Sequence, residues 1–459
     1  MDKLTFIVLF IISLLLAPIE SLDRDFPDGL DFLAEHVDLD VQDHLWDDDF
    51  ESEPLDYSSY VGKILVNVDS FGAVGDGLTD DTQAFVNAWG VACSASNSVL
   101  LVPENRIYLV SAIRFKGPCA GKLTIQIDGK IVAPDDPKAW DPKNPRTWLG
   151  FYNLSKASFE GLGVIDGSGS KWWANSCKRN KSNALTIESS SAVKVKGLTI
   201  QNGQQMNFII SKSDSVRVSD VLVSAPGDSP NTDGIHISAS TNVILRNCKI
   251  GTGDDCVSIV SGSSGIKMKN IYCGPGHGIS IGSLGKDNST GIVENVVLET
   301  AFIQNATNGL RIKTWQGGNG HVTNVKYQNV VMEEVSNPII IDQFYCDSPK
   351  SCKNQTSALE ISNIVYRDIT GTSTTKRAIT FSCSDTVPCT GILLKDIDLQ
   401  GTNGSVETYC HSVYGYERGL VQPSADCLLP PNGKDTVSLQ RDEANDGGDE
   451  GSHIIHTEL

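Results

Sequence analysis

The sequence lacks most of the features that mark membrane, zinc-binding and nucleic-acid-binding proteins. After residue 21 it contains no apolar run that suggests a membrane span. It has no CxxC pair and no cluster of histidine with cysteine, which argues against a zinc site. It has no basic stripe, which argues against a nucleic acid as partner. Hairpin turns between paired apolar runs are sparse, and no helical apolar stripe runs through the repeats in the middle of the chain.

Acidic residues are concentrated at the two ends of the chain. The 459 residues carry a formal net charge of -19. Residues 22–60 hold 14 acids and one base, and residues 431–459 hold 7 acids and 2 bases. The central residues 61–430 hold 33 of each and are neutral. We therefore expect one folded domain at 61–430, preceded by an acidic leader or pro-segment at 22–60 and followed by a disordered acidic tail at 431–459.

Residues 1–21, MDKLTFIVLFIISLLLAPIES, resemble a secretory signal peptide. A short charged start precedes about a dozen apolar residues and an exit of small residues, which is too short for a comfortable membrane span. We expect a secreted, extracellular protein that does not bind a membrane.

Twelve cysteines fit an oxidising compartment. Short separations suggest five disulfides, which are Cys93–Cys119, Cys256–Cys273, Cys346–Cys352, Cys383–Cys389 and Cys410–Cys427. Cys248 occupies an inward apolar slot and is expected to be a buried free thiol, and Cys177 has no evident partner. Six sequons suit a glycosylated surface, at Asn153, Asn180, Asn288, Asn305, Asn354 and Asn403.

A short motif recurs through the middle of the chain. An apolar residue is followed by two residues and a second apolar residue, usually with Gly, Asn or Asp just before the second. The motif occurs as VKGL at 195, VSDV at 218, LRNC at 245, MKNI at 268, VENV at 293, VTNV at 322, ISNI at 361 and LKDI at 394. Because Gly, Asn and Asp tolerate left-handed backbone angles, each motif predicts a bend between two short strands.

Coils of about 22–30 residues made of short strands predict an all-β fold, a right-handed parallel β-helix. A β-sandwich is the alternative, but it requires more hairpin turns than this region contains. Residues 77–93, GLTDDTQAFVNAWGVAC, predict a helix capped by Thr or Asp. Such an N-terminal capping helix would cover the apolar end of the coils, which would otherwise face water.

The stretch GTGDDCVSI, residues 251–259, places two carboxylates side by side, which costs stability unless something uses or neutralises them. Four strands align, as DGIHI at Asp233, DCVSI at Asp255, HGISI at His277 and NGLRIK at Asn308. Their shared alternation puts the apolar residues on one inward face. On consecutive coils Asp233, Asp255 and His277 would stack about 4.8 Å apart, with Asp254 beside them.

This set of side chains predicts acid–base chemistry on an acidic sugar. Crowded aspartates should leave at least one carboxyl with a raised pKa beside ionised ones, and glycoside hydrolysis requires that combination. Arg311 and Lys313 alternate outward on the same side as His236, Ser258 and Ser280, and two such cations suit a sugar carboxylate. The alternative is a structural set in which the cations only neutralise the aspartates.

Four segments in order, SPNTDGIHI, GTGDDCVSI, GPGHGISIGSLG and GLRIKTWQGG, resemble the signature segments of the polygalacturonases, glycoside hydrolase family 28. The flanking FGAVGDGLTDDTQAF and IIIDQFYC are also similar to plant members, so the resemblance covers residues 62–430. It implies a right-handed parallel β-helix that hydrolyses α-1,4-linked galacturonan, the backbone of pectin, with inversion and without a metal or cofactor. We expect an endo-acting monomer of the cell wall.

Carried over residue by residue, the resemblance implies that Asp254 is the general acid and that Asp233 with Asp255 activates the water. It implies that His277 supports protonation of the acid, that Arg311 and Lys313 bind the substrate carboxylate, and that Tyr345 in DQFYC contacts the substrate. Asn207 stands where plant members have histidine, which puts a peripheral substrate contact in question.

Other activities fit parts of the pattern. An exo-polygalacturonase or a rhamnogalacturonan hydrolase would share the fold and the acids, and a calcium-dependent pectate lyase or a non-catalytic wall-binding solenoid would share the fold. A spacing of about 5 Å is nearer the retaining range of glycosidases than the inverting range of roughly 6.5–9.5 Å, whereas the resemblance favours inversion. A further hypothesis is that the acidic leader shields a substrate groove until it is removed.

Overall fold

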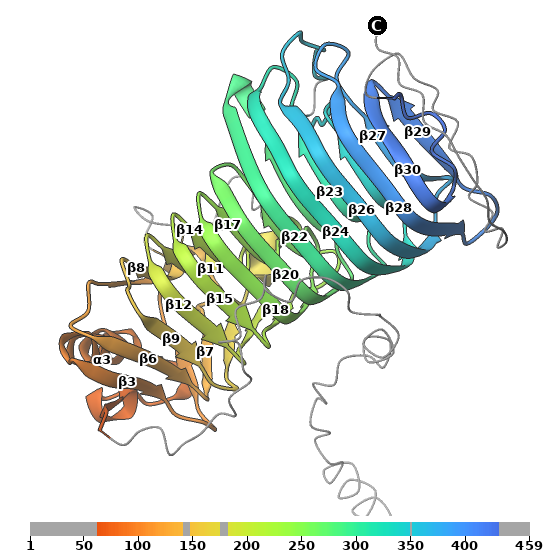
Figure 1. The fold of residues 1–459 in the computed structure, drawn as a ribbon. Coiled ribbons are helices and arrows are strands. Elements are labelled where there is room, and N and C mark those ends of the chain that lie inside the picture. Colours follow the sequence, from red (N-terminus) through yellow and green to blue (C-terminus); the bar gives the residue numbers. More distant parts are fainter. Residues whose placement is uncertain (1–61, 141–146, 175–181, 349–350, 431–459) are drawn as a thin grey trace, which may run out of the picture.

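The computed structural model describes residues 62–140, 147–174, 182–348 and 351–430. Regular structure in these ranges is almost entirely β-strand, wound into one elongated coil (Figure 1). The predicted signal peptide, leader and tail, together with Cys177, lie outside the described residues.

Eleven strands form the sheet that carries the candidate site, here called the site sheet, and each strand pairs in parallel with the next. In sheet order these are β5 (Ile113–Lys116), β8 (Thr147–Tyr152), β11 (Asn183–Glu188), β14 (Phe208–Ser211), β17 (Ile235–Ser238), β19 (Val257–Ile259), β21 (Ile279–Leu284), β23 (Asn308–Thr314), β25 (Asn337–Asp342), β27 (Arg377–Ser382) and β29 (Glu407–His411).

The other nineteen strands form a second parallel sheet, here called the bent sheet because its long strands contain a bend. Its strands are β1 (Ile64–Asn67), β2 (Asp76–Asp80), β3 (Asn97–Val102), β4 (Ile107–Leu109), β6 (Lys122–Ile127), β7 (Lys130–Val132), β9 (Ala157–Glu160), β10 (Val164–Asp166), β12 (Ser191–Lys196), β13 (Thr199–Gln201), β15 (Asp214–Ser219), β16 (Leu222–Ser224), β18 (Thr241–Gly251), β20 (Ser263–Cys273), β22 (Thr290–Gln304), β24 (Asn319–Val335), β26 (Glu360–Ser373), β28 (Cys389–Gly401) and β30 (Val413–Gln422). Connections between successive parallel strands are right-handed. The predicted right-handed parallel β-helix is therefore confirmed, and the sandwich alternative is wrong.

The predicted bends all have left-handed backbone angles, but they do not form one repeating position. Positive φ is found at Gly197, Asp220, Asn247, Asn270, Asn295, Asn324, Asn363 and Asp396. Because Lys269 pairs with Glu299, the bend at Asn270 in β20 corresponds to a bend at Thr300 in β22. Asn295 belongs to a different bend, nearer the start of β22. The bends predicted at all eight motifs are therefore confirmed, and Thr300, with φ 63°, occupies a further bend that the motif does not mark.

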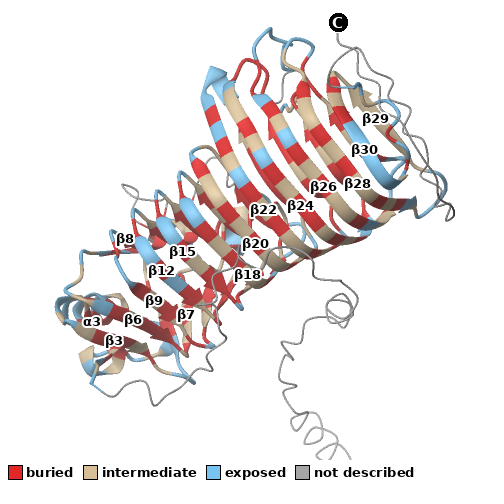
Figure 2. Cartoon of the chain, viewed as in Figure 1, coloured by how far each residue is buried: buried red, intermediate tan, exposed pale blue. Residues whose placement is uncertain are grey.

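The core is a stack of apolar side chains inside the coil. Predicted inward residues from adjacent coils pair in register, such as Ile235 with Val257 and Val257 with Ile279. These residues are fully buried, and buried and exposed residues alternate along the strands (Figure 2). Each buried side chain of this size contributes about 1.5–3 kcal/mol to folding. A slip of one residue would turn the whole set outward, so burial fixes the register.

The predicted capping helix is present as α3 (Thr82–Ser94), at the N-terminal end of the coil (Figure 1). It begins later than predicted because Asp76–Asp80 forms β2. Asp81 does not cap the helix with its side chain; its carboxylate accepts hydrogen bonds from the backbone N–H groups of Val74 (2.6 Å) and Gly75 (3.2 Å). The buried face of α3 joins the core through Ala84, Phe85, Ala88, Trp89 and Ala92. The remaining short helices are η4 (Val68–Phe71), η5 (Pro137–Ala139), α4 (Ser170–Trp173) and η6 (Lys286–Asn288).

All five predicted disulfides are present. Cys248 is buried and outside any disulfide, as predicted, and burial raises the pKa of its thiol to about 12. Of the predicted sequons, the five within the described ranges have exposed asparagines. In the same ranges no helix has the length and apolar character that crossing a bilayer requires.

Candidate active site

The candidate site lies where three successive coils enter the site sheet. Asp233 precedes β17, the Asp254–Asp255 pair precedes β19, and His277 precedes β21. The pairing of β17 with β19 and of β19 with β21 puts Asp233, Asp255 and His277 at equivalent positions, each two residues before the paired strand residues. The predicted alignment of these strands is therefore confirmed.

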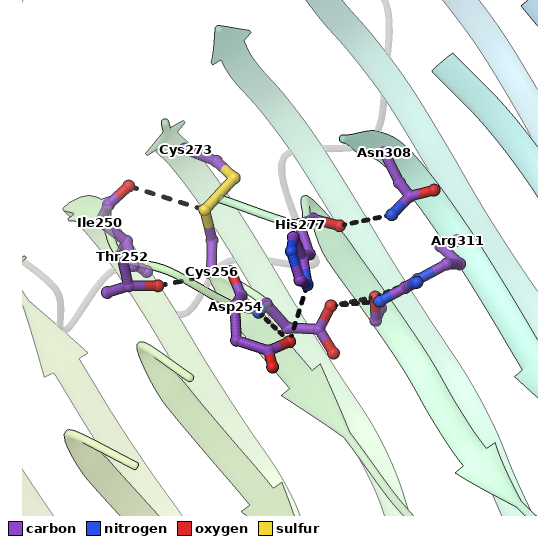
Figure 3. Close-up of a disulfide and its surroundings, with 10 residues drawn as sticks. Ile250, Thr252, Asp254, Cys256, Cys273, His277, Asn308 and Arg311 are labelled. Carbon is purple, nitrogen blue, oxygen red and sulfur yellow. Dashed lines mark hydrogen bonds and ion pairs between the residues drawn. A yellow bond between two sulfur atoms is a disulfide. The ribbon is translucent and has the colours of Figure 1, made fainter. Parts of the chain in front are cut away.

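The turn that carries the two adjacent aspartates is packed tightly against the preceding coil. A Cβ added to Gly253 would lie 1.9 Å from the carbonyl oxygen of Ser229, so only glycine fits there. The N–H of Gly253 donates to Oγ1 of Thr232 (3.1 Å). On the other side the Cys256–Cys273 disulfide ties the turn to β20 (Figure 3). Asp254 and Asp255 are thus held by both neighbouring coils.

Asp254 and His277 form a close pair (Figure 3). Nδ1 of His277 lies 3.0 Å from Oδ1 of Asp254, and Nδ2 of Asn231 donates to Oδ2 of Asp254 (3.2 Å). Burial on its own would raise the pKa of Asp254, but the hydrogen bond and charge of His277 outweigh burial and lower it to about 2. The hydrogen bond with Asp254 raises the pKa of His277. Both shifts favour a proton on His277 over one on Asp254.

Asp255 is the most enclosed of the three carboxylates, with a side chain that is 3 % exposed. It accepts hydrogen bonds from Nη2 of Arg311 (2.6 Å), Nζ of Lys313 (2.8 Å) and Oγ of Ser280 (2.8 Å). Nε of Arg311 also donates to Ser280 (2.9 Å). A guanidinium has five N–H donors and an ammonium three, so these contacts leave donors on both cations for another anion.

Asp233 is held by the neighbouring strand and has the raised pKa that the crowding predicts. Oγ of Ser258 donates to its Oδ2 (2.6 Å), and Nδ1 of His236 lies 3.7 Å from the same oxygen. Burial raises the pKa of Asp233, and the charges of Asp254 and Asp255 raise it further. The free site therefore differs from the simplest expectation, because Asp254, the implied acid, has the lowered pKa.

Several residues that support the site had no role in the sequence analysis. Asn231 orients Asp254, and Ser258 and Ser280 orient Asp233 and Asp255 from the outward face of the site sheet. The strand alignment placed both serines on that face. Asn231 lies within the signature segment SPNTDGIHI, but no role was predicted for it.

Asn207 is a buried support and not a peripheral substrate contact. It is 0 % exposed, and its Nδ2 donates to the carbonyl oxygens of Thr232 (3.2 Å) and Asp233 (3.1 Å). Its Oδ1 accepts a hydrogen bond from the N–H of Gly203 (2.8 Å). The amide therefore fixes the backbone that carries Asp233.

Tyr345 lies beside the two cations, shortly after β25. Nζ of Lys313 is 5.5 Å from the centre of the Tyr345 ring. The rings of Trp315 and Tyr345 are perpendicular, with their centres 5.5 Å apart. Burial raises the pKa of Tyr345 to about 12, so its hydroxyl stays protonated at neutral pH. Asp342 pairs in register with Lys313, and burial raises the pKa of Asp342.

The same residues fit a metal ion poorly, although ligand atoms of Asp254, Asp255 and His277 lie within 4.8 Å of one another. Both oxygens of Asp255 already accept from Arg311 and Lys313, two cations that would repel a metal. A metal would also have to displace the proton of His277, whose pKa is raised. The arrangement suits proton transfer beside a bound anion.

Comparison with known proteins agrees with this geometry. Residues 93–419 match the sequence profile described as "Glycosyl hydrolases family 28". A probable polygalacturonase from Arabidopsis thaliana is 47% identical over 393 residues, 83% of this chain and 87% of the relative. A polygalacturonase from Persea americana is 49% identical over 372 residues, 79% of each chain.

A solved structure supports the fold. The exopolygalacturonase of Thermotoga maritima superposes with a TM-score of 0.65 at 20% identity, over 77% of this chain and 90% of that one. The resemblance seen in the four motifs is confirmed by the matched profile and the two plant relatives: the chain belongs to glycosyl hydrolases family 28.

Proposed function

We propose that this protein is a polygalacturonase that hydrolyses the α-1,4-galacturonosyl linkages of pectin, with inversion and by endo action. The observation that carries the proposal is the Asp254–His277 pair standing beside Asp233 and beside an Asp255 that is held by two cations. The plant relatives named polygalacturonase support the same activity. A hydrolase with these groups needs no cofactor.

Arg311 and Lys313 bind the carboxylate of a galacturonate unit. Each keeps donors beyond those given to Asp255, and both emerge from β23 toward the outward face of the site sheet. Arg311 offers a planar pair of N–H groups and Lys313 a compact charge, a combination suited to a carboxylate. Tyr345 bounds this position and contacts the sugar through its ring and hydroxyl.

Asp254 donates the proton to the leaving glycosidic oxygen. His277 returns a proton to Asp254 across their 3.0 Å contact, so the pair stores the proton that the carboxyl with its low pKa does not retain alone. As the carbon–oxygen bond of the linkage breaks, a negative charge develops on the leaving oxygen and raises its affinity for the proton. Asp254 is more exposed than Asp255, at 16% against 3% of the side chain, which fits contact with substrate.

Asp233, together with Asp255, activates the water that attacks the anomeric carbon. The raised pKa of Asp233 makes its ionised form a stronger base than ionised Asp254. The water gives its proton to this carboxylate while its oxygen bonds to the sugar. Asp255 keeps the two cations in place and adds negative charge next to the developing oxocarbenium ion.

The proposal extends to the rest of the chain. Residues 1–21 direct secretion to the cell wall, residues 22–60 and 431–459 flank the catalytic domain, and the protein acts as a monomer. Its partner is the pectic polysaccharide, and it has no nucleic-acid or membrane partner.

The first test is a time course of product size on polygalacturonic acid. Endo hydrolysis yields reducing ends with a broad range of oligomers at early times, with or without a chelator. A product with ultraviolet absorbance that disappears with chelator would replace hydrolysis by a lyase reaction. Release of monomer or dimer alone from the first minutes would make the enzyme exo-acting.

The assignment of acid and base is tested by comparing Asp254→Asn with Asp233→Asn. On polygalacturonate both variants should lose about 10²–10⁴ of the rate. On an aryl galacturonide with a good leaving group, which needs little protonation, Asp254→Asn should recover most of its loss and Asp233→Asn should not. The exposed Asp426→Asn serves as the control with unchanged rates. Recovery by Asp233→Asn instead would exchange the two roles.

The pH dependence of activity tests whether His277 holds the proton that Asp254 donates. Because the pKa of His277 is raised, activity should fall only as the pH rises above the ordinary value of 6.5. In His277→Gln the proton must be held by Asp254 alone. The fall of kcat/KM on the alkaline side of the profile should therefore occur at a pH lower by at least about one unit. His321→Gln, which removes a histidine–carboxylate pair with Glu294 in the bent sheet, should leave the profile unchanged. An unmoved alkaline limb in His277→Gln would contradict this role.

A further inference from the structure

The bent sheet carries a strongly positive surface that the proposed hydrolysis does not use. In the half of each strand that precedes the bend, two outward columns of side chains run across β12, β15, β18, β20, β22 and β24. These columns contain seven basic residues, here called the cationic face: Lys194, Lys196, Arg217, Arg246, Lys267, Lys269 and Lys326. Glu299 is the one carboxylate in the same two columns of these strands, and it pairs with Lys269 at 3.2 Å.

Basic side chains are neighbours at two places on the cationic face. Lys194 pairs in register with Arg217, and Arg246 pairs in register with Lys269, on strands about 4.8 Å apart. Burial and the charge of Arg367 on the next strand lower the pKa of Lys326, whereas the charges of Glu299 and Asp368 raise it. Residues 61–430 are neutral overall, so this gathering of basic residues is local, and it suits an acidic partner.

We propose that the acidic leader, residues 22–60, docks on the cationic face. The leader holds 14 acids and one base, which makes it the most strongly acidic segment of the chain. Its partner surface has seven bases and one acid in the two columns, so the two charges are complementary. The 29 residues of the tail, with 7 acids and 2 bases, match the face less well.

The connection of the leader to the domain favours this face. The described chain begins just before β1, which belongs to the bent sheet and leads through β3, β6 and β9 to β12, where the face begins. The nine strand spacings from β1 to β24 amount to about 43 Å. The 39 residues of the leader span up to about 130 Å when extended, so they can follow the whole face. Covalent attachment also supplies an effective concentration in the millimolar range.

The candidate active site is a poorer target for the leader. Asp233, Asp254 and Asp255 present three carboxyl groups there beside two cations, Arg311 and Lys313, whereas the cationic face has seven bases and one acid in its two columns. The site also lies on the other sheet. A leader docked on the cationic face leaves the catalytic carboxylates open, in contrast to the hypothesis that it shields the substrate site.

The test uses the chain from residue 22 to 459 with a protease site inserted between residues 60 and 61. After cleavage at low ionic strength, the leader should stay with the domain in gel filtration and should leave it at high salt. Hydrogen exchange should show leader-dependent protection in β15, β18 and β20. Hydrolysis of polygalacturonate should be the same before and after cleavage.

Two matched variants separate the face from net charge. Lys194→Glu/Lys267→Glu/Lys326→Glu should weaken leader retention at least about tenfold, since three attractive contacts become repulsive. Lys116→Glu/Lys138→Glu/Lys156→Glu changes the net charge equally on exposed lysines outside the strands of the face and should weaken retention less than about threefold. Thermal unfolding of each variant, and a Lys→Gln version of the first, distinguish lost docking from lost folding.

The proposal is overturned if the cleaved leader leaves the wild-type domain at low salt, or if both triple variants release it equally. A rise in activity on cleavage would place the leader over the active site and would also overturn it. Binding of polygalacturonate to the cationic face without binding of the leader would also overturn the proposal.

Discussion

The parallel register of the site sheet is the constraint on which the rest of the structure depends. Backbone hydrogen bonds set each strand one spacing from the next, and the inward apolar residues allow only one alignment. Since Asp233, Asp255 and His277 stand at the same offset from their strands, the burial of Ile235, Val257 and Ile279 also determines where the catalytic groups lie. The forces that fold the coil are therefore the forces that assemble the site.

Holding three carboxyl groups together has an electrostatic cost, and the surrounding residues offset it differently for each one. Asp255 is neutralised by Arg311 and Lys313, Asp254 by the protonated His277, and Asp233 by a raised pKa and the hydrogen bond from Ser258. As a result, the pKa of Asp233 is raised while that of Asp254 is lowered, within one small patch. Division of work between acid and base follows from these environments, because the side chains themselves are chemically identical.

Much of the fold could be predicted because its rules are local. The alternation of apolar residues placed the inward stack, Asn and Asp placed the bends, and short separations identified the disulfides. The motif did not mark the bend at Thr300, where a branched residue adopts the left-handed angle against its local preference. The prediction failed at the start of α3, because Asp81 uses its carboxylate to hold a loop and not to cap the helix.

The residues of the candidate site could be predicted from the sequence, but the direction of their pKa shifts could not. The strand alignment brought Asp233, Asp255 and His277 together, but which carboxyl has the raised pKa depends on burial and on contacts between distant coils. The orienting amide of Asn231 and the buried support from Asn207 belong to turns, where no periodic pattern reveals the side-chain direction. Sequence periodicity specifies position along a strand, whereas proton affinity is set by three-dimensional surroundings.

The stereochemistry of the reaction tests the central claim most directly. If Asp254 protonates the leaving oxygen while Asp233 and Asp255 direct water to the opposite side of the sugar, the anomeric carbon inverts its configuration in one displacement. Proton NMR of a galacturonate oligomer during the first minutes of hydrolysis should then show the β-anomer at the new reducing end before mutarotation produces the α-anomer. Appearance of the α-anomer first would mean that configuration is retained, and would contradict the account of the site.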